Sequence, residues 1–298
     1  MATFHMNIKA GKSGNAGNHL DYILREGKYK NRINDDDKRI VYRRCPVKGN
    51  METLKDFFKD ADKYERKNGT PYKEIEFALP NELTIEQNNE IVKEFCNKYM
   101  HNKYFIAVIH DKKISTIENK QNVHCHLMFS ERIIDNIERN KSDFFKRYNS
   151  KNPEKGGAKK DRFFTDYKTR SKHLKQARKD LEIITNKILK KYNIQSYVSC
   201  ETLKIQSKIE MKKGNKIKAK ILDRKPEQHI HFQILNNDID LIYKIRKLRK
   251  LKNERSKNIE YGEELKKNKK TVRIKQKLNF SSWNKEKNNK LKNNYKGI

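Results

Sequence analysis

Apolar and polar residues alternate along residues 122–132, which predicts a strand with two chemically different faces. Val123 and Leu127 lie on an apolar face that suits packing against helices. His124 and His126 lie two residues apart on the opposite face, where their imidazoles would be neighbours. This strand is the segment around which the rest of the chain can be arranged.

A continuous apolar run at residues 104–110 predicts a buried strand that ends in His110. The polar connection at 111–121 indicates that this strand pairs with the next one as a hairpin, which could bring His110 beside the other two histidines. Three histidines that leave coordination positions open are typical of a catalytic metal site. A bare H-x-H pair can equally be two hydrogen-bonded histidines on a half-exposed strand, so both interpretations stay open at this point.

Residues 72–80 form another two-faced strand pattern. Ile75 and Phe77 share its apolar face, and Glu74 and Glu76 share the other. The glutamate face could be the histidine face of the same sheet.

The remaining periodicities predict helices between the strands. Further strands are expected at 3–9 and 40–44, and the expected helices span residues from 13 or 15 to 27, from 50 or 53 to 67, 84–99, 142–148 and 166–192. Thr84 and Gln87 have the spacing of a capping box. The order predicts an α+β fold with a mainly antiparallel sheet, helices on one face and the polar face open, followed by a long helix and a basic C-terminal extension.

Charge narrows the function classes. The chain has 298 residues, with 71 basic and 38 acidic residues, for a net charge of +33. Such an excess suits a polyanionic partner, above all nucleic acid, although a composition rich in Lys, Asn and Ile accounts for part of it. No apolar run approaches the length of a membrane span, and residues 1–13 lack the apolar core of a signal peptide, so no membrane insertion is expected.

The four cysteines indicate a reducing, cytoplasmic setting. Cys45, Cys96, Cys125 and Cys200 have no C-x-x-C spacing and fit neither a zinc finger nor a disulfide framework. A glycine-lysine-serine at residues 11–13 resembles the end of a phosphate-binding loop, but Met6 stands where the first glycine is required.

Five stretches together resemble the MobA/MobL relaxases of mobilisable plasmids, a family within the HUH nucleases. They are DYILREGKY at 21–29, KEIEFALP at 73–80, NVHCHLMFSER at 122–132, FKRYN at 145–149 and PEKGGAK at 153–159. They occur in the family's order and cover about residues 1 to 205, whereas H-x-H alone is not specific.

The resemblance implies a relaxase fold, a divalent metal (Mg²⁺ or Mn²⁺) on His110, His124 and His126, and Tyr22 as the nucleophile. A metal held by three neutral imidazoles keeps its charge and polarises a scissile phosphate. Tyrosine is a weak nucleophile at its usual pKa of about 10, so the metal or a carboxylate must favour loss of its proton. Attack would leave a 5′-phosphotyrosine and a free 3′-hydroxyl, and the reverse attack would rejoin the strand.

Two carboxylates and several basic residues complete the expected site. We expect Glu74 or Glu76 to act as a base or to orient a metal-bound histidine. Contacts to DNA are expected from residues within or beside the matched stretches: Arg25, Lys28, Tyr29, Arg132, Lys146, Arg147, Lys155 and Lys159. The expected DNA is an origin of transfer in single-stranded and hairpin form.

The resemblance fades beyond about residue 203. We expect a relaxase domain at 1–205, a basic helical extension at 206–255 and a charged tail at 256–298. His229 and His231 form a second H-x-H, but it lacks the flanking residues and the upstream histidine of the first. Accessory mobilisation proteins and a type IV secretion coupling protein are the implied partners, and export to a recipient cell on DNA is compatible with a cytoplasmic origin.

Three other functions remain compatible with the sequence. A rolling-circle replication initiator would use the same chemistry at a different origin. A non-catalytic basic nucleic-acid-binding protein would bind with strong salt dependence and form no covalent product. A metal-dependent nuclease that uses water would cleave without retaining Tyr22 on the DNA.

Overall fold

The computed structural model describes residues 4–32, 39–44, 51–113 and 121–224, with a few single residues between 251 and 262. The chain divides into two compact units, Met1–Cys200 and Glu201–Ile298, and each is described by itself.

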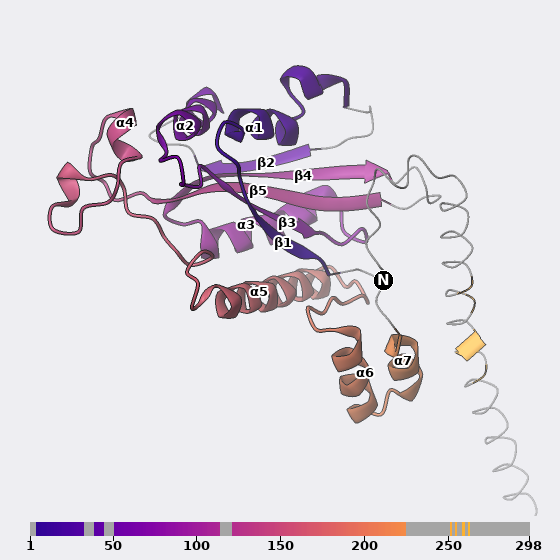
Figure 1. The fold of residues 1–298 in the computed structure, drawn as a ribbon. Helices are drawn as coiled ribbons and strands as arrows, with labels where there is room; N and C mark the ends of the chain where they lie inside the picture. The colour runs from indigo at the N-terminus through magenta and orange to yellow at the C-terminus, as the bar shows by residue number, and fades with distance from the viewer. Residues whose placement is uncertain are drawn as a thin grey trace, which may run out of the picture. The chain divides into compact units, whose positions relative to one another are not determined.

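A five-stranded antiparallel sheet forms the centre of the first unit (Figure 1). Its strands are β1 (Met6–Ala10), β2 (Arg39–Arg44), β3 (Lys73–Ala78), β4 (Lys103–Lys113) and β5 (Gln121–Ile133). Their order is β1-β3-β5-β4-β2, and every neighbouring pair is antiparallel. The predicted hairpin between the two histidine strands is therefore confirmed.

The helices of the first unit alternate with these strands as the periodicities predict. They are α1 (Ala16–Leu24), α2 (Met51–Tyr64), α3 (Ile85–Tyr99), the short α4 (Lys141–Phe144) and α5 (Arg170–Lys191), with 3-10 turns η1 (Gly27–Arg32) and η2 (Pro153–Lys155). The expected capping box is present, because the Gln87 amide nitrogen donates to Thr84 Oγ1 at 3.2 Å and the Thr84 amide to Gln87 Oε1 at 2.9 Å.

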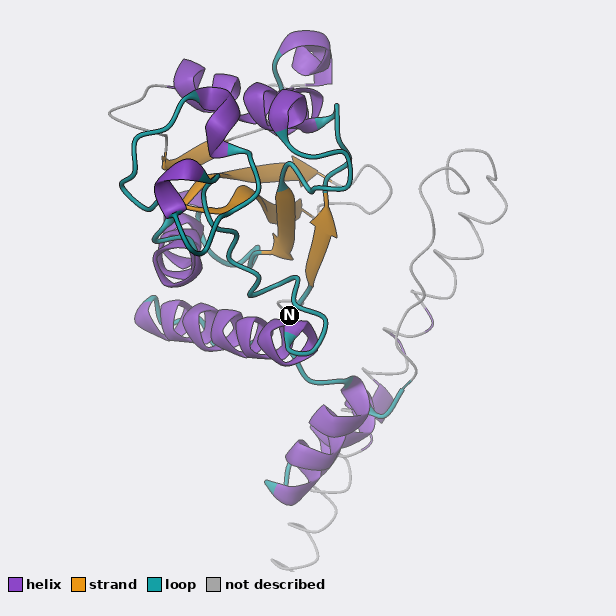
Figure 2. Ribbon diagram, turned by 60° about the vertical axis from the view of Figure 1, so that its left-hand side comes forward, coloured by secondary structure: helices purple, strands orange, loops and turns teal. Residues whose placement is uncertain are grey.

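Helices cover both faces of the sheet (Figures 1 and 2). One apolar cluster joins the Ile75, Phe77 and Leu127 side of the sheet to α3 and α5. A second joins Ile106 and Val108 of β4 to α1 and α2. The α+β class and the antiparallel sheet are confirmed, but the expectation of helices on one face only is wrong.

The physical reason lies in β4. Its apolar run places large side chains on both faces, and burying both requires a helical layer on each side. The end of the second face that carries the histidines is polar, and Tyr22 of α1 is partly exposed.

The second unit contains a helix pair. It is formed by α6 (Leu203–Lys212) and α7 (Lys216–Leu222), and the Ser207 hydroxyl donates to the Ala219 carbonyl at 2.8 Å. The second H-x-H pair at His229 and His231, most of the predicted 240–255 helix and nearly all of the charged tail lie outside the described residues. Within the described ranges, no helix is both long and apolar enough to cross a membrane.

Candidate metal centre

Three histidines converge at one end of the β4–β5 hairpin. The strand register places His110 directly opposite His124, and His126 lies two residues further along the same face of β5. One ligand nitrogen from each ring lies within 4.8 Å of the others. His110 and His126 are buried and His124 is half-buried, so the three imidazoles form a compact, largely dry cluster.

Each imidazole is oriented by a hydrogen bond to an oxygen that can only accept. Nδ1 of His124 lies 2.6 Å from the Asn122 carbonyl oxygen, and Nδ1 of His126 lies 2.6 Å from Glu74 Oε1. Nε2 of His110 lies 2.7 Å from the Ile23 carbonyl oxygen. Each of these nitrogens must carry the hydrogen, so the other nitrogen of each ring keeps its lone pair. In His110 that lone pair, on Nδ1, faces the Arg25 guanidinium at 3.4 Å.

The environment keeps His110 and His124 neutral. Burial, reinforced by the neighbouring His126, lowers the pKa of His110 to about 3. The same two causes lower the pKa of His124. Neutral imidazoles with fixed ring orientations are the form in which histidine binds a divalent metal, so the donor set fits such an ion.

Glu74 is placed to orient a histidine. Burial alone would raise its pKa, but the hydrogen bond from His126 and the nearby His19 imidazole outweigh burial and hold the pKa well below its ordinary value. Nε2 of His19 lies 3.1 Å from the same Glu74 oxygen that accepts from His126. A carboxylate held ionised in this way is a poor general base and a good anchor for an imidazole.

Glu76 occupies a more open position on the same strand face. It lies opposite His126 in the β3–β5 register, and its carboxylate pairs with Lys9 of β1 at 2.8 Å. Burial tends to raise the pKa of Glu76, and the Lys9 ammonium lowers it below its ordinary value. The predicted sharing of one face by Glu74, Glu76 and the histidines is confirmed by the β3–β5 register. Of the two carboxylates, Glu74 is the one that accepts a hydrogen bond from His126.

Replacing Glu74 by Gln is expected to weaken divalent-metal binding about 10- to 100-fold, because the amide removes the negative charge that fixes the His126 ring. Calorimetric titration with Mn²⁺ measures the effect. Glu76→Gln is the matched control and should bind the metal with an affinity near that of the wild type. Equal affinity of Glu74→Gln and the unsubstituted protein would contradict an orienting role for Glu74.

Helix α1 carries Tyr22 and is anchored at its start by α2. The backbone N–H groups of Gly14, Ala16 and Gly17 donate to the Asp62 carboxylate at 2.9, 2.7 and 3.3 Å. A carboxylate at this position satisfies N–H groups that the helix leaves unpaired and complements its dipole. Asp62 therefore fixes the helix on which Tyr22 lies.

Tyr22 lies against the histidine cluster. Its ring meets the His126 ring edge-on at a centroid distance of 6.1 Å. Tyr29, from η1, lies edge-on to Tyr22 at 5.5 Å. The Arg25 guanidinium lies over the Tyr22 ring, 4.7 Å from its centroid. The fold thus brings together the Tyr22 phenol, the Arg25 guanidinium and the three histidines that could bind a metal ion.

Arg25 belongs to this centre and not to the outer surface. It follows α1 in the left-handed conformation, with φ of 56° and ψ of 47°, and it is 8% exposed. One guanidinium nitrogen donates to the Tyr22 carbonyl at 3.3 Å, and the other lies 3.4 Å from Nδ1 of His110. A non-glycine residue held in this backbone region is a strained position of the kind that gathers at functional sites.

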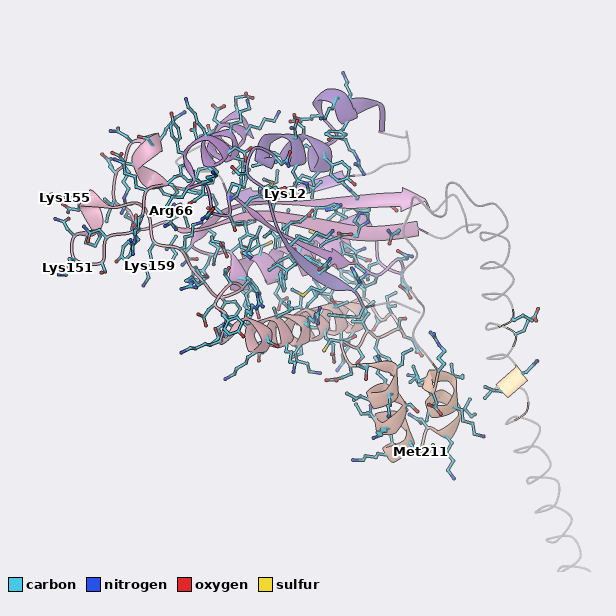
Figure 3. All side chains as sticks on the ribbon, viewed as in Figure 1. Lys12, Arg66, Lys151, Lys155, Lys159 and Met211 are labelled. Atoms are coloured by element: carbon cyan, nitrogen blue, oxygen red, sulfur yellow. The ribbon has the colours of Figure 1, made fainter. Side chains whose placement is uncertain are left out.

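The other predicted DNA contacts divide into two groups. Lys28, Lys146, Arg147, Lys155 and Lys159 are exposed, and Tyr29 is half-buried beside Tyr22. Figure 3 shows Lys155 and Lys159 in the loop region next to α4 and η2.

Arg132 is buried, so the prediction that it contacts DNA phosphate is wrong. It is 2% exposed, and its Nε and Nη2 atoms donate to the two Glu65 carboxylate oxygens at 3.0 Å each. Its remaining N–H groups donate to the carbonyls of Phe145, Lys146 and Ala158. The guanidinium is fully used inside the protein, so Arg132 holds the 145–158 loop in place.

Replacing Arg132 by Ala is expected to lower the free energy of unfolding by about 3 kcal/mol, because the buried Glu65 carboxylate loses its two hydrogen-bonding guanidinium nitrogens and keeps only the Lys160 ammonium at 3.2 Å. Denaturant unfolding measures the loss. Lys187→Ala, which removes an exposed ion pair with Glu94, is the control and should change stability by less than about 1 kcal/mol. An Arg132→Ala protein of normal stability with one phosphate contact fewer in a salt titration would restore the surface interpretation.

Sequence reasoning did not assign roles to His19, Asp62 or Glu65. His19 precedes Tyr22 by one helical turn, so the helical spacing was an available signal for a shared face. Asp62 and Glu65 interact with residues 45 or more positions away, and no local pattern marks such partners.

Comparison with known proteins identifies the family of the chain. The MobA/MobL family model matches residues 25–225, and the chain belongs to the MobA/MobL family, as the sequence resemblance predicts. A 43 kDa relaxation protein of Salmonella typhimurium is 36% identical over 214 residues, which are 69% of this chain and 55% of that protein. Mobilization protein A of Escherichia coli is 42% identical over 165 residues, which are 54% of this chain and 22% of that protein.

Two solved structures are similar to part of the chain. A structure described as the molecular basis of vancomycin resistance transfer in Staphylococcus aureus gives a TM-score of 0.45 at 23% identity, covering 67% of this chain and 99% of that chain. A Mn-bound MobM relaxase domain with plasmid oriT DNA gives a TM-score of 0.37 at 12% identity, covering 62% of this chain and 86% of that chain.

Proposed function

We propose that the protein is a plasmid mobilisation relaxase, which nicks one DNA strand at an origin of transfer through Tyr22 and later rejoins it. The observation that carries the proposal is the placement of Tyr22 against His126 within a cluster of three oriented histidines. Family membership and the names of the two curated relatives, a relaxation protein and a mobilization protein, support the same activity.

His110, His124 and His126 would hold a divalent cation, Mg²⁺ or Mn²⁺, and for His110 this requires the Arg25 guanidinium to give up its contact with Nδ1. Such an ion, when bound, supplies positive charge that polarises the scissile phosphate and stabilises its transition state. Glu74, Asn122 and Ile23 keep the three rings in register for it.

Tyr22 performs the covalent step. Its phenol oxygen loses a proton and bonds to phosphorus, while the bond from phosphorus to the 3′ oxygen breaks and that oxygen takes up a proton. The product is a 5′-phosphotyrosine and a free 3′-hydroxyl. One phosphodiester linkage replaces another, so attack by a 3′-hydroxyl can reverse the step without ATP.

Arg25 and the sheet position the reactants. The Arg25 guanidinium, close to both Tyr22 and His110, can bind a phosphate oxygen that reaches the histidines. The fixed start of α1 at Asp62 and the paired strands β4 and β5 limit the motion of nucleophile and ligands, and such pre-organisation lowers the barrier of a step that joins two groups.

The test is incubation with Mn²⁺ and single-stranded oligonucleotides that span a candidate origin of transfer and are labelled at the 3′ end, which stays attached to a 5′-phosphotyrosine, followed by a denaturing protein gel. A label that migrates with the protein and disappears after protease treatment is expected. Free cut fragments without a labelled protein would favour the water-using nuclease. Binding without cleavage across several metals would favour the non-catalytic protein, and cleavage confined to a replication origin would favour the rolling-circle initiator.

A relaxase would also meet accessory mobilisation proteins and a type IV secretion coupling protein. Membership of the MobA/MobL family is the only support for these partners.

A further inference from the structure

A basic cavity lies at the far end of β5 from the histidines. Its volume is about 760 Å³, and its lining includes Arg66, Arg147, Lys159 and Arg162. His126 and Arg132 are six residues apart on β5, which at about 3.3 Å per residue places the cavity roughly 20 Å from the metal centre. It is therefore separate from the site described above.

The cavity is built on a buried support. The Glu65–Arg132 ion pair links the end of α2 to the end of β5 and fixes the carbonyls of the 145–158 loop. Within this loop the two backbone segments pack so closely that a Cβ added at Gly157 would be 2.0 Å from the Lys146 carbonyl oxygen. The cavity wall is thus held by contacts that leave little room for movement.

Four cations on this wall are available to a ligand. The side chains of Arg66, Arg147, Lys159 and Arg162 are exposed, and none of them forms an ion pair with a residue that the structure describes. The neighbouring Lys160 differs, because its ammonium lies 3.2 Å from Glu65. Four unneutralised cations on one concave surface fit a chain of phosphates.

The loop between β1 and α1 leaves the sheet at a level between the two sites, because Ala10 lies opposite Lys73 and Lys73 lies opposite Phe129, which is between His126 and Arg132 on β5. The Gly11 amide donates to the Tyr72 carbonyl at 2.9 Å, and the Gly14 amide donates to the carboxylate of Asp62 in the last turn of α2. Arg66 follows the end of the same helix. Lys12 in this loop is exposed. Figure 3 shows Lys12 over the sheet and Arg66 and Lys159 further toward the α4 and η2 end.

We propose that the cavity is a second phosphate-binding subsite, and that the DNA backbone runs from the histidines past Lys12 to Arg66, Arg147, Lys159 and Arg162. This inference rests on the proposed function. At a rise of about 3.4 Å per stacked nucleotide, a separation of roughly 20 Å corresponds to about six nucleotides. The protein therefore holds the strand at two points, the scissile phosphate and a position about six nucleotides away on one side of it.

The test compares DNA binding by the full chain in Mn²⁺ with oligonucleotides of different length. One oligonucleotide ends two nucleotides from the nick position on both sides, and two others extend ten nucleotides on one side only. Salt titrations are performed with the unsubstituted protein, with the double variant Arg66→Gln, Arg162→Gln, and with Lys172→Gln, Lys175→Gln. The last variant removes two exposed cations from α5, on the opposite face of the sheet.

We expect the Arg66→Gln, Arg162→Gln variant to lose affinity for only one of the two long oligonucleotides. For it, the slope of log affinity against log salt concentration should fall by about 1.4 in Arg66→Gln, Arg162→Gln, since each lost phosphate contact to a single strand is worth about 0.7. The α5 variant should retain the unsubstituted slope on every oligonucleotide. Thermal melting checks that both variants are folded.

Two outcomes would overturn the proposal. A slope that falls equally on the short oligonucleotide would mean that these arginines act through general charge or at the nick itself. An unchanged slope on both long oligonucleotides would mean that the cavity binds no DNA. The readout is binding, so a protein that forms no covalent adduct but shows the length-dependent loss would refute the nicking function and leave the second subsite standing.

Discussion

Tyr22→Phe is expected to form no covalent complex with DNA, a loss on the order of 10³-fold or more in strand cleavage. The variant lacks the oxygen that bonds to phosphorus, but it keeps the ring that packs against His126 and Arg25. Metal affinity and DNA affinity should therefore remain close to those of the unsubstituted protein. Labelled oligonucleotide transferred to protein on a denaturing gel measures the adduct.

Tyr29→Phe is the matched control, because Tyr29 contacts Tyr22 edge-on and is the only other tyrosine that the structure pairs with it among the described residues. We expect this variant to form the adduct. An adduct that survives in Tyr22→Phe and disappears in Tyr29→Phe would move the nucleophile to η1. Survival in both variants would refute a nucleophile at either position.

His126→Ala is expected to weaken divalent-metal binding by more than about 100-fold, which exceeds the usual effect of losing an outer partner of a ligand. The substitution removes one of three donors and also leaves Glu74 without the hydrogen bond that it accepts at 2.6 Å. Adduct formation should disappear with the metal. Calorimetry with Mn²⁺ and the gel assay measure the two effects.

The control for this experiment is His101→Ala, which removes an exposed histidine from the turn after α3. Chelation of the unsubstituted protein should abolish the adduct, and added Mn²⁺ should restore it. An adduct that forms in chelator at the normal rate would contradict a metal-dependent reaction, and normal Mn²⁺ affinity in His126→Ala would place the ion elsewhere.

Two predictions about the site follow directly from the geometry of β-strands. Alternation along β5 put His124 and His126 on one face, and the short connection made an antiparallel hairpin with β4 the natural partner. The same alternation put Glu74 and Glu76 together on β3. Each of these inferences needs only the two-residue period of a strand and the pairing of neighbours, and the structure confirms both.

The apolar run of β4 already indicated that helices cover both faces of the sheet. Its unbroken apolar run signalled burial on both faces, which is incompatible with an open second face. The polar histidines of β5 occupy only part of that face. Helix α1 covers the apolar part and ends beside the polar part, and this is why Tyr22 reaches the histidines.

What the sequence by itself determined is therefore the local structure: the order of strands and helices, the shared faces, the hairpin and the motif-bearing residues Tyr22, His110, His124 and His126. The tertiary structure alone decided which distant groups meet. Glu65 and Arg132 are 67 residues apart, and Arg25 and His110 are 85 apart. No periodic pattern in the sequence marks such contacts, because they depend on how whole helices and strands pack. A buried arginine and a DNA-binding arginine cannot be distinguished in the sequence until that packing is known.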